Sequence, residues 1–94
     1  MVFDISKVAG IGDFTTKKEK ERELFLKGDK AFLVINKNTL EVRTDEKLGK
    51  LLREKYESVM ESRYFGRGGI EIVPAGQLKT DELEDLVRLS YNLS

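Results

Sequence analysis

The stretch that decides the fold, residues 30–52, reads KAFLVINKNTLEVRTDEKLGKLL. It opens with the largely apolar run KAFLVI, turns at Asn36-Lys37-Asn38, and continues as Thr39–Arg43, where apolar and polar side chains alternate. Alternation with a period of two predicts a strand with one buried face, and Asn tolerates the backbone of tight turns. The stretch therefore predicts two antiparallel strands, at 30–35 and 39–43, that lead into a helix.

The helix is expected over residues 45–56. Thr44 is the expected N-cap, since a hydroxyl can accept a hydrogen bond from a free backbone N–H of the first turn. The two acids that follow Thr44 lie where the helix dipole is positive. An apolar stripe recurs at helical spacing and would face the core: Leu48, Leu51, Leu52 and Tyr56. We expect Leu52, at the centre of this stripe, to be fully buried.

Before this stretch, residues 21–27 form another run suited to a strand, and Gly28-Asp29 joins it to the strand at 30–35 as a hairpin. Lysine and glutamate are interleaved at 17–23, which predicts a solvated segment because their charges cancel. Residues 1–16 are rich in apolar side chains but interrupted by glycines, so a long helix is excluded. Two alternatives stay open there: an ordered arm or helical turn covering one end of the core, or a frayed terminus.

After the helix, the chain predicts two further strands and a second helix. The strands are expected at Ser58–Phe65 and at 70–73, where Pro74 ends the second one because proline cannot donate to a ladder. Thr80 is the expected cap of a last helix over 80–92. Its apolar stripe consists of Leu83, Leu86, Val87 and Tyr91.

These elements predict a single α+β domain over residues 1–94. The expected order is β-β-β-α-β-β-α, with room for a short helix at the N-terminus. An antiparallel sheet of about five strands would carry two main helices packed on it. The arm at 1–16 would precede a compact core at 20–94.

The composition limits the chemistry that this chain can perform. It contains neither Cys nor His, which excludes disulfides, Ser–His–Asp triads and the usual zinc sites. We therefore expect no enzyme, no cofactor and no metal. Lys plus Arg and Asp plus Glu number 17 each, so net charge favours no class of partner.

The same composition bears on location. The apolar runs are too short to span a membrane, and the N-terminus lacks the apolar region of a signal peptide. We expect a cytoplasmic protein without a membrane partner. Few amide side chains, many mixed charges and no Cys also fit a thermophile.

The candidate functional segment is Arg63-Tyr64-Phe65-Gly66-Arg67-Gly68-Gly69. Two guanidiniums can hold phosphate, a ring can stack on a base, and glycines let a phosphate approach backbone N–H groups. We expect the turn to project beyond the sheet, with Phe65 inward and Tyr64 outward, since consecutive strand side chains point oppositely. The expected nucleic-acid-binding residues are Arg63, Tyr64, Arg67, Gly68 and Gly69. An ordinary strand-to-strand turn is the alternative.

From about residue 22 to 94 the chain resembles the MmcQ/YjbR-like family. The resemblance lies in the run at 30–35, in Leu40–Asp45 with the Leu-rich helix, and in the closing Ser90-Tyr91-Asn92-Leu93, which is similar to the family's Ser-Tyr-Asp-Leu type of ending. Val73-Pro74 before the last helix is similar to the neighbouring TfoX N-terminal domain family. The resemblance implies a CyaY-like fold and no reaction, in a family often called DNA-binding.

The chain departs from the MmcQ/YjbR-like pattern in two places. The full N-terminal helix usual in the family is shortened or lost. The usual stretch with His and Trp before the penultimate strand is replaced by Arg63–Gly69.

We expect a small non-enzymatic binding domain, and two kinds of partner stay open. The Arg/aromatic/Gly turn favours DNA or RNA. The balanced charge favours a protein-interaction or regulatory domain of TfoX N-terminal type. That domain would bind a protein partner or a second copy through Leu89, Leu93 and the apolar arm. A salt titration separates the two, because nucleic-acid binding weakens steeply with salt.

Overall fold

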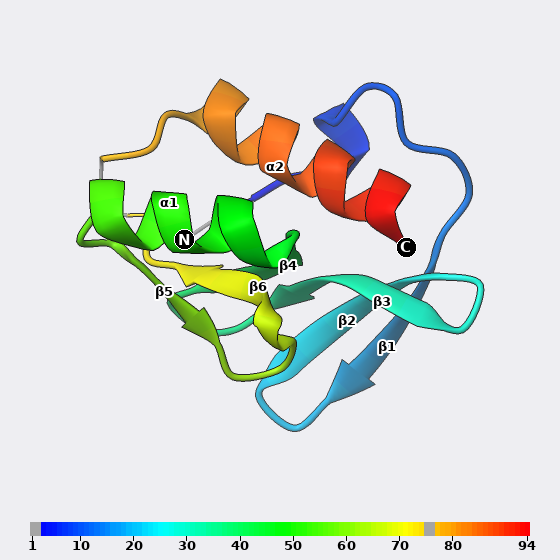
Figure 1. Ribbon diagram of the computed structural model, residues 1–94. Helices are drawn as coiled ribbons and strands as arrows, with labels where there is room; N and C mark the ends of the chain where they lie inside the picture. The colour runs from blue at the N-terminus through cyan, green and yellow to red at the C-terminus, as the bar shows by residue number, and fades with distance from the viewer. Residues whose placement is uncertain (1–2, 75–76) are drawn as a thin grey trace.

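The computed structural model describes residues 3–74 and 77–94. A six-stranded antiparallel sheet is covered on one face by two α-helices (Figure 1), which confirms the expected α+β class. The strand order in the sheet is β1-β2-β3-β4-β6-β5. In chain order the elements are the 3₁₀ turn η1 (Ile5–Lys7), β1 (Thr15–Glu19), β2 (Arg22–Lys27), β3 (Lys30–Ile35), β4 (Leu40–Arg43), α1 (Glu46–Lys55), β5 (Val59–Ser62), β6 (Gly66–Ile72) and α2 (Thr80–Leu93).

The expected three strands over residues 21–43 are present as β2, β3 and β4, but a further strand precedes them. β1 pairs with β2 in the register Thr15↔Leu26 to Glu19↔Arg22. Its first four side chains are all exposed, so no apolar alternation marks it in the sequence. The expected solvated segment has exposed lysines at 17, 18 and 20. Its backbone is in addition paired with the edge of β2, which the sequence did not predict.

The N-terminal arm is ordered over its described residues and covers one end of the core. η1 is the single helical turn that was one of the two expectations, and Asp4 caps it by accepting from the backbone N–H of Ser6. Val8 is buried and Ile5 packs partly against the core. The hydroxyl of Tyr91 on α2 donates to the carbonyl of Asp13 at 3.0 Å. The arm is therefore fastened to α2.

The main core lies between the sheet and the helices. Leu40 pairs across the sheet with Ile72 and Val42 with Ile70, and all four side chains are fully or almost fully buried. Ser90, also fully buried, fixes α2 above them. Its hydroxyl accepts from the backbone N–H of Arg43 and donates to the carbonyl of Phe32. Because strand side chains alternate, the residues between these apolar positions face the opposite side of the sheet.

Helix α1 lies where it was expected, but its cap and its buried face differ. Asp45, not Thr44, is the N-cap, and its carboxylate accepts from the N–H of Leu48. The buried residue of α1 is Gly49, which lies against Thr44 and Ile70. Since α1 approaches the sheet through this glycine, Leu52 is only half-buried. The prediction of a fully buried Leu52 was wrong.

The N-cap of helix α2 also lies one residue from its expected position. Lys79 is the N-cap, and its backbone N–H donates to the carboxylate of Glu82 at 3.1 Å, while Thr80 is the first helical residue. In the part of the chain that the structure describes, no helix is long and apolar enough to cross a membrane.

Candidate functional site

The turn between β5 and β6 does not project beyond the sheet. β5 ends at Ser62, three residues before the expected end of the strand, and the chain turns at 63–65. The backbone N–H of Tyr64 donates to Glu41 on β4, and the guanidinium of Arg22 on β2 lies over the Tyr64 ring. The turn therefore folds back across the face of the sheet opposite to the helices, here called the open face.

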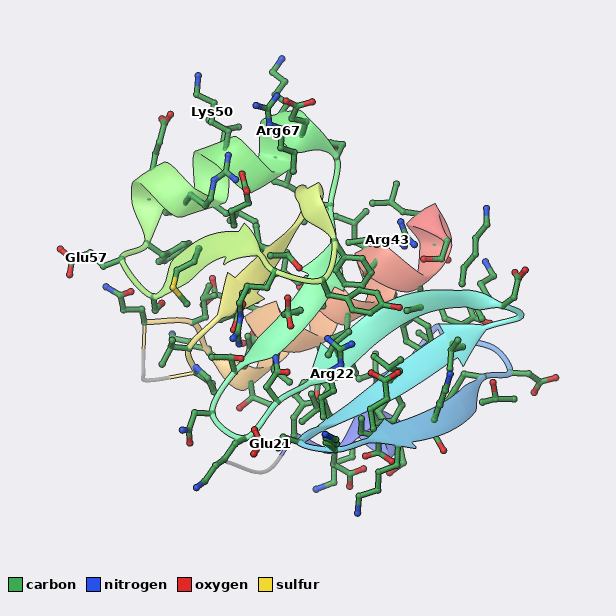
Figure 2. The ribbon with its side chains drawn as sticks, turned by 90° about the horizontal axis from the view of Figure 1, so that it is seen from below. Glu21, Arg22, Arg43, Lys50, Glu57 and Arg67 are labelled. Carbon is green, nitrogen blue, oxygen red and sulfur yellow. The ribbon has the colours of Figure 1, made fainter. Side chains whose placement is uncertain are left out.

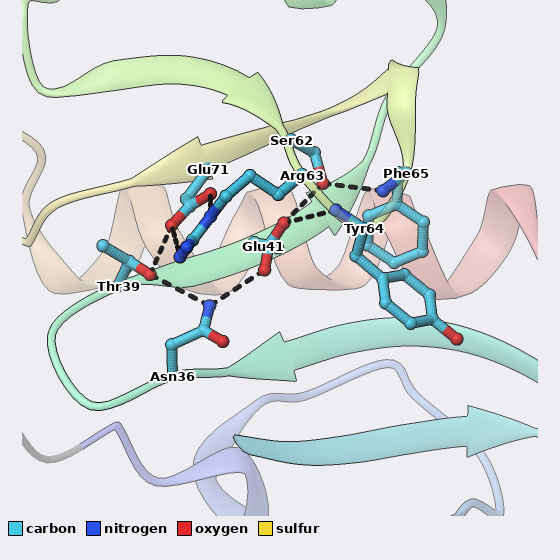
Figure 3. A network of polar contacts seen from close by, with 8 residues as sticks. All are labelled: Asn36, Thr39, Glu41, Ser62, Arg63, Tyr64, Phe65 and Glu71. Carbon is cyan, nitrogen blue, oxygen red and sulfur yellow. Dashed lines mark hydrogen bonds and ion pairs between the residues drawn. The ribbon is translucent and has the colours of Figure 1, made fainter. Parts of the chain in front are cut away.

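A buried glutamate holds the turn in this position. Glu41 is only 1% exposed, and one carboxylate oxygen accepts from the hydroxyl of Ser62 at 2.7 Å and from the N–H of Tyr64 at 2.9 Å. Its other oxygen accepts from the amide of Asn36 at 2.9 Å. The hydroxyl of Ser62 in turn accepts from the N–H of Phe65 (Figure 3). These bonds satisfy the buried carboxylate, as a buried charge requires.

A second buried glutamate lies directly across the ladder, because Glu41 and Glu71 are register partners on β4 and β6. Like charges in this position repel. Arg63 offsets the repulsion by donating from Nε and Nη2 to the two oxygens of Glu71, at 2.9 and 2.7 Å (Figure 3). The hydroxyl of Thr39 also donates to Glu71. The hydrogen bond from Arg63 holds the pKa of Glu71 below its ordinary value despite burial, and the same bond raises the pKa of Arg63.

A second arginine, Arg22 on β2, is likewise held by a glutamate. The guanidinium carbon of Arg22 lies 5.1 Å from the centroid of the Tyr64 ring, and its Nε donates to Glu19 at 2.7 Å. Phe65 meets Tyr64 edge-on, with ring centroids 4.9 Å apart. Tyr64 is exposed and Phe65 half-buried, which is the orientation that we expected, although both rings belong to a turn and not to a strand.

The remaining three predicted residues do not join this group. In Figure 2 Arg67 lies at the α1 side of the sheet, whereas Arg22 lies on the side of β2. The carbonyl of Gly68 accepts from the N–H of Thr44. Gly69 is buried, and a Cβ there would lie 2.6 Å from Val42 O and from the Cβ of Phe65. Gly69 therefore makes room for Phe65 to fold onto the sheet, and its place is not one that a phosphate can approach.

The arginines Arg22 and Arg63 line one hollow of about 1120 Å³ on the open face. The turns β1–β2 and β3–β4 supply most of its other walls. The complete lining is Glu19, Lys20, Glu21, Arg22, Asn36, Lys37, Asn38, Glu41 and Arg63. Sequence reasoning found Arg63 but missed Lys20, Arg22 and Lys37, because only the register of β1–β4 brings these turns together.

One of the three glutamates that line the hollow is buried, so its surface carries more cations than acids. Four cations and three glutamates line it, but Glu41 is buried and turned inward toward its hydrogen-bond donors. A ligand at the surface therefore meets four cations and two carboxylates. Within the described ranges, no group of three or more acidic side chains is placed to hold a metal ion.

No protein-family model and no curated protein matches this sequence. The fold is similar to that of a solved structure, Deinococcus radiodurans protein DR2400, described as a DUF419 domain, with a TM-score of 0.75 and 16% sequence identity. The match covers 95% of this chain and 71% of that one. DUF419 is the MmcQ/YjbR-like family. This likeness shows the fold.

Proposed function

We propose that this chain is a small, cytoplasmic, non-enzymatic domain of the MmcQ/YjbR-like type that binds nucleic acid on its open face. One observation carries the proposal: Arg22 and Arg63, each held by a glutamate, line a single hollow beside the exposed ring of Tyr64. Arginine, lysine and an aromatic ring in one groove are what a phosphate backbone and its bases require.

The geometry of Arg63 suits a phosphate. Its guanidinium bonds Glu71 through Nε and Nη2, which leaves both N–H groups of Nη1 and one of Nη2 for a ligand. The side chain is 75% exposed although its partner is buried. Because Glu71 already fixes the guanidinium, little side-chain entropy is lost when an anion binds.

The lysines add charge without a competing partner. Lys20 and Lys37 are exposed at the turns that line the hollow, and neither forms an ion pair with any residue that the structure describes. Each can therefore contact a phosphate without first breaking a bond. The alternative of a protein partner has less support, because Val8 and Ile5 of the apolar arm pack against the chain's own core.

The test is a salt titration of binding to mixed-sequence DNA and RNA oligonucleotides, followed by fluorescence anisotropy. The double variant Lys20→Ala/Lys37→Ala should lower the slope of log K against log salt by about 1.4, which corresponds to two phosphate contacts on a single strand. Its matched control is Lys50→Ala/Arg67→Ala, which removes the same charge at the α1 side and should leave the slope near that of the wild type. If the wild type does not bind even at low salt, the proposal fails and a protein-interaction role replaces it.

A further inference from the structure

We infer that the nucleic acid bound here is single-stranded, with a base stacked on the composite surface of Tyr64 and Arg22. The inference rests on the proposed function, since it names the kind of nucleic acid that the same hollow takes. It follows from how the turn at 63–65 lies on the sheet.

The turn of the β5–β6 ribbon is not free to enter a duplex. The major groove of B-DNA admits a helix or a two-stranded ribbon that stands out from the protein. The β5–β6 ribbon has its turn fastened to β4, because the N–H of Tyr64 donates to Glu41. Both α-helices pack on the other face of the sheet (Figure 1). The hollow is therefore a surface on which a strand lies.

A single strand exposes its bases, and a surface beside the hollow can receive one. Tyr64 is 38% exposed and the side chain of Arg22 is 39% exposed, with the guanidinium over the Tyr64 ring. Both an aromatic ring and a guanidinium plane accept a stacked base. The contact with Phe65 and the bond from Arg22 to Glu19 hold the pair in place before binding.

The stacking surface adjoins the cations of the hollow, because Arg22 belongs to both. Arg63 lies on the β5–β6 side, and Lys20 and Lys37 lie on the turns across the hollow, all in the same lining. A strand whose base stacks on Tyr64 and Arg22 then has neighbouring phosphates near the cations of the hollow. The arrangement requires a base that is free of a complementary strand.

The experiment measures anisotropy at low salt with three probes. The first probe is a single strand of roughly 12 nucleotides, a length within the range that one OB-fold covers. The others are a hairpin duplex of the same sequence and an abasic strand with the same number of phosphates. Wild type should bind the single strand tighter than the abasic strand by between about 5- and 150-fold, the range for one stacked base. The hairpin should bind more weakly than the single strand.

Tyr64→Ala should lower affinity for the single strand to that for the abasic strand, whereas Tyr64→Phe should retain the difference. A strand carrying 2-aminopurine gives a readout that needs no variant, since its fluorescence should be quenched when wild type stacks on the base. Equal or tighter binding of the hairpin, or equal binding of the abasic strand, overturns the inference while nucleic-acid binding stands. Absence of binding to all three probes overturns the proposed function itself.

Discussion

At the scale of single residues, the open face depends on two carboxylates that sequence patterns would place in water. Glu41 and Glu71 alternate with apolar neighbours in their strands, which is the pattern of a half-buried strand with a solvated face. In the structure both are buried, and every hydrogen bond described for them comes from the turn at 63–65, its flanking residues or the β3–β4 turn. They are buried because that turn folds back over them, and no local sequence pattern predicts this.

Glu41→Ala should destabilise the domain by about 2–4 kcal/mol, because it removes packed atoms and leaves the donors of Ser62, Tyr64 and Asn36 without their acceptor. Urea unfolding at neutral pH measures the change. Glu57→Ala is the control, since Glu57 is exposed and should alter the free energy of unfolding by less than about 0.5 kcal/mol. Equal midpoints for the two variants would contradict the role given to Glu41.

The lowered pKa of Glu71 predicts how stability depends on pH. Because Arg63 holds this pKa below the ordinary glutamate value, the folded state binds a proton less readily than the unfolded state. The stabilisation is therefore complete above the unfolded pKa of about 4.3 and is lost as pH falls through the folded pKa.

Urea unfolding of wild type and Glu71→Gln, each at neutral pH and in steps below about pH 4.5, measures this effect. The difference in unfolding free energy between them should be largest at neutral pH and shrink as the solution is acidified. A difference that stays constant over the whole range would show that the Arg63–Glu71 pair does not stabilise the fold.

At the scale of elements, the sequence pattern predicted the helices and strands that have a strong apolar period and missed β1, which has none. β4 and α2 carry clear apolar alternation or a stripe, and both lie within a residue or so of their expected bounds. β1 is TTKKE, with its first four side chains exposed, so only its pairing with β2 defines it. The stripe of α1 was recognised, but Gly49 turns the helix so that Leu51 is 56% exposed. Contact with the sheet, not periodicity, sets that rotation.

A substitution at Gly69 tests how β6 and the turn at 63–65 pack together. Gly69→Ala should destabilise the domain by about 1–3 kcal/mol, since the added methyl meets Val42 O and the Cβ of Phe65 at 2.6 Å and neither atom belongs to a flexible chain end. Gly68→Ala is the matched control, because its Cβ would meet only the carbonyl of Phe65 at an ordinary 3.6 Å. Thermal unfolding compares the two. A Gly69→Ala variant as stable as Gly68→Ala would mean that Phe65 is not packed over this position.

At the scale of the whole molecule, the helices and the cations of the hollow lie on opposite sides of the sheet (Figure 1). The helices cover one face of the sheet, with the main core beneath them (Figure 1), and the hollow with its cations lies on the other. Arg63 and Tyr64 could be found from sequence because arginines, aromatics and glycines cluster there. Lys20, Arg22 and Lys37 could not be found from sequence, because they lie far along the chain from residues 63–65. Their sequence neighbours are also residues typical of any solvated loop.

This separation predicts that salt acts on binding through the hollow even though the net charge of the chain is zero. Counterions are released by the cations that touch phosphate and not by the chain as a whole. Two to four contacts from the cations of the hollow give a slope of log K against log salt between about −1.4 and −2.8 for a single strand. Across the same salt range the urea midpoint should change little, because exposed ion pairs such as Arg53–Glu61 contribute only about 0–1 kcal/mol. Parallel anisotropy and unfolding series measure both quantities. A slope near zero with measurable affinity would show that the ligand is held by apolar contacts, and the cations of the hollow would then have no part in binding.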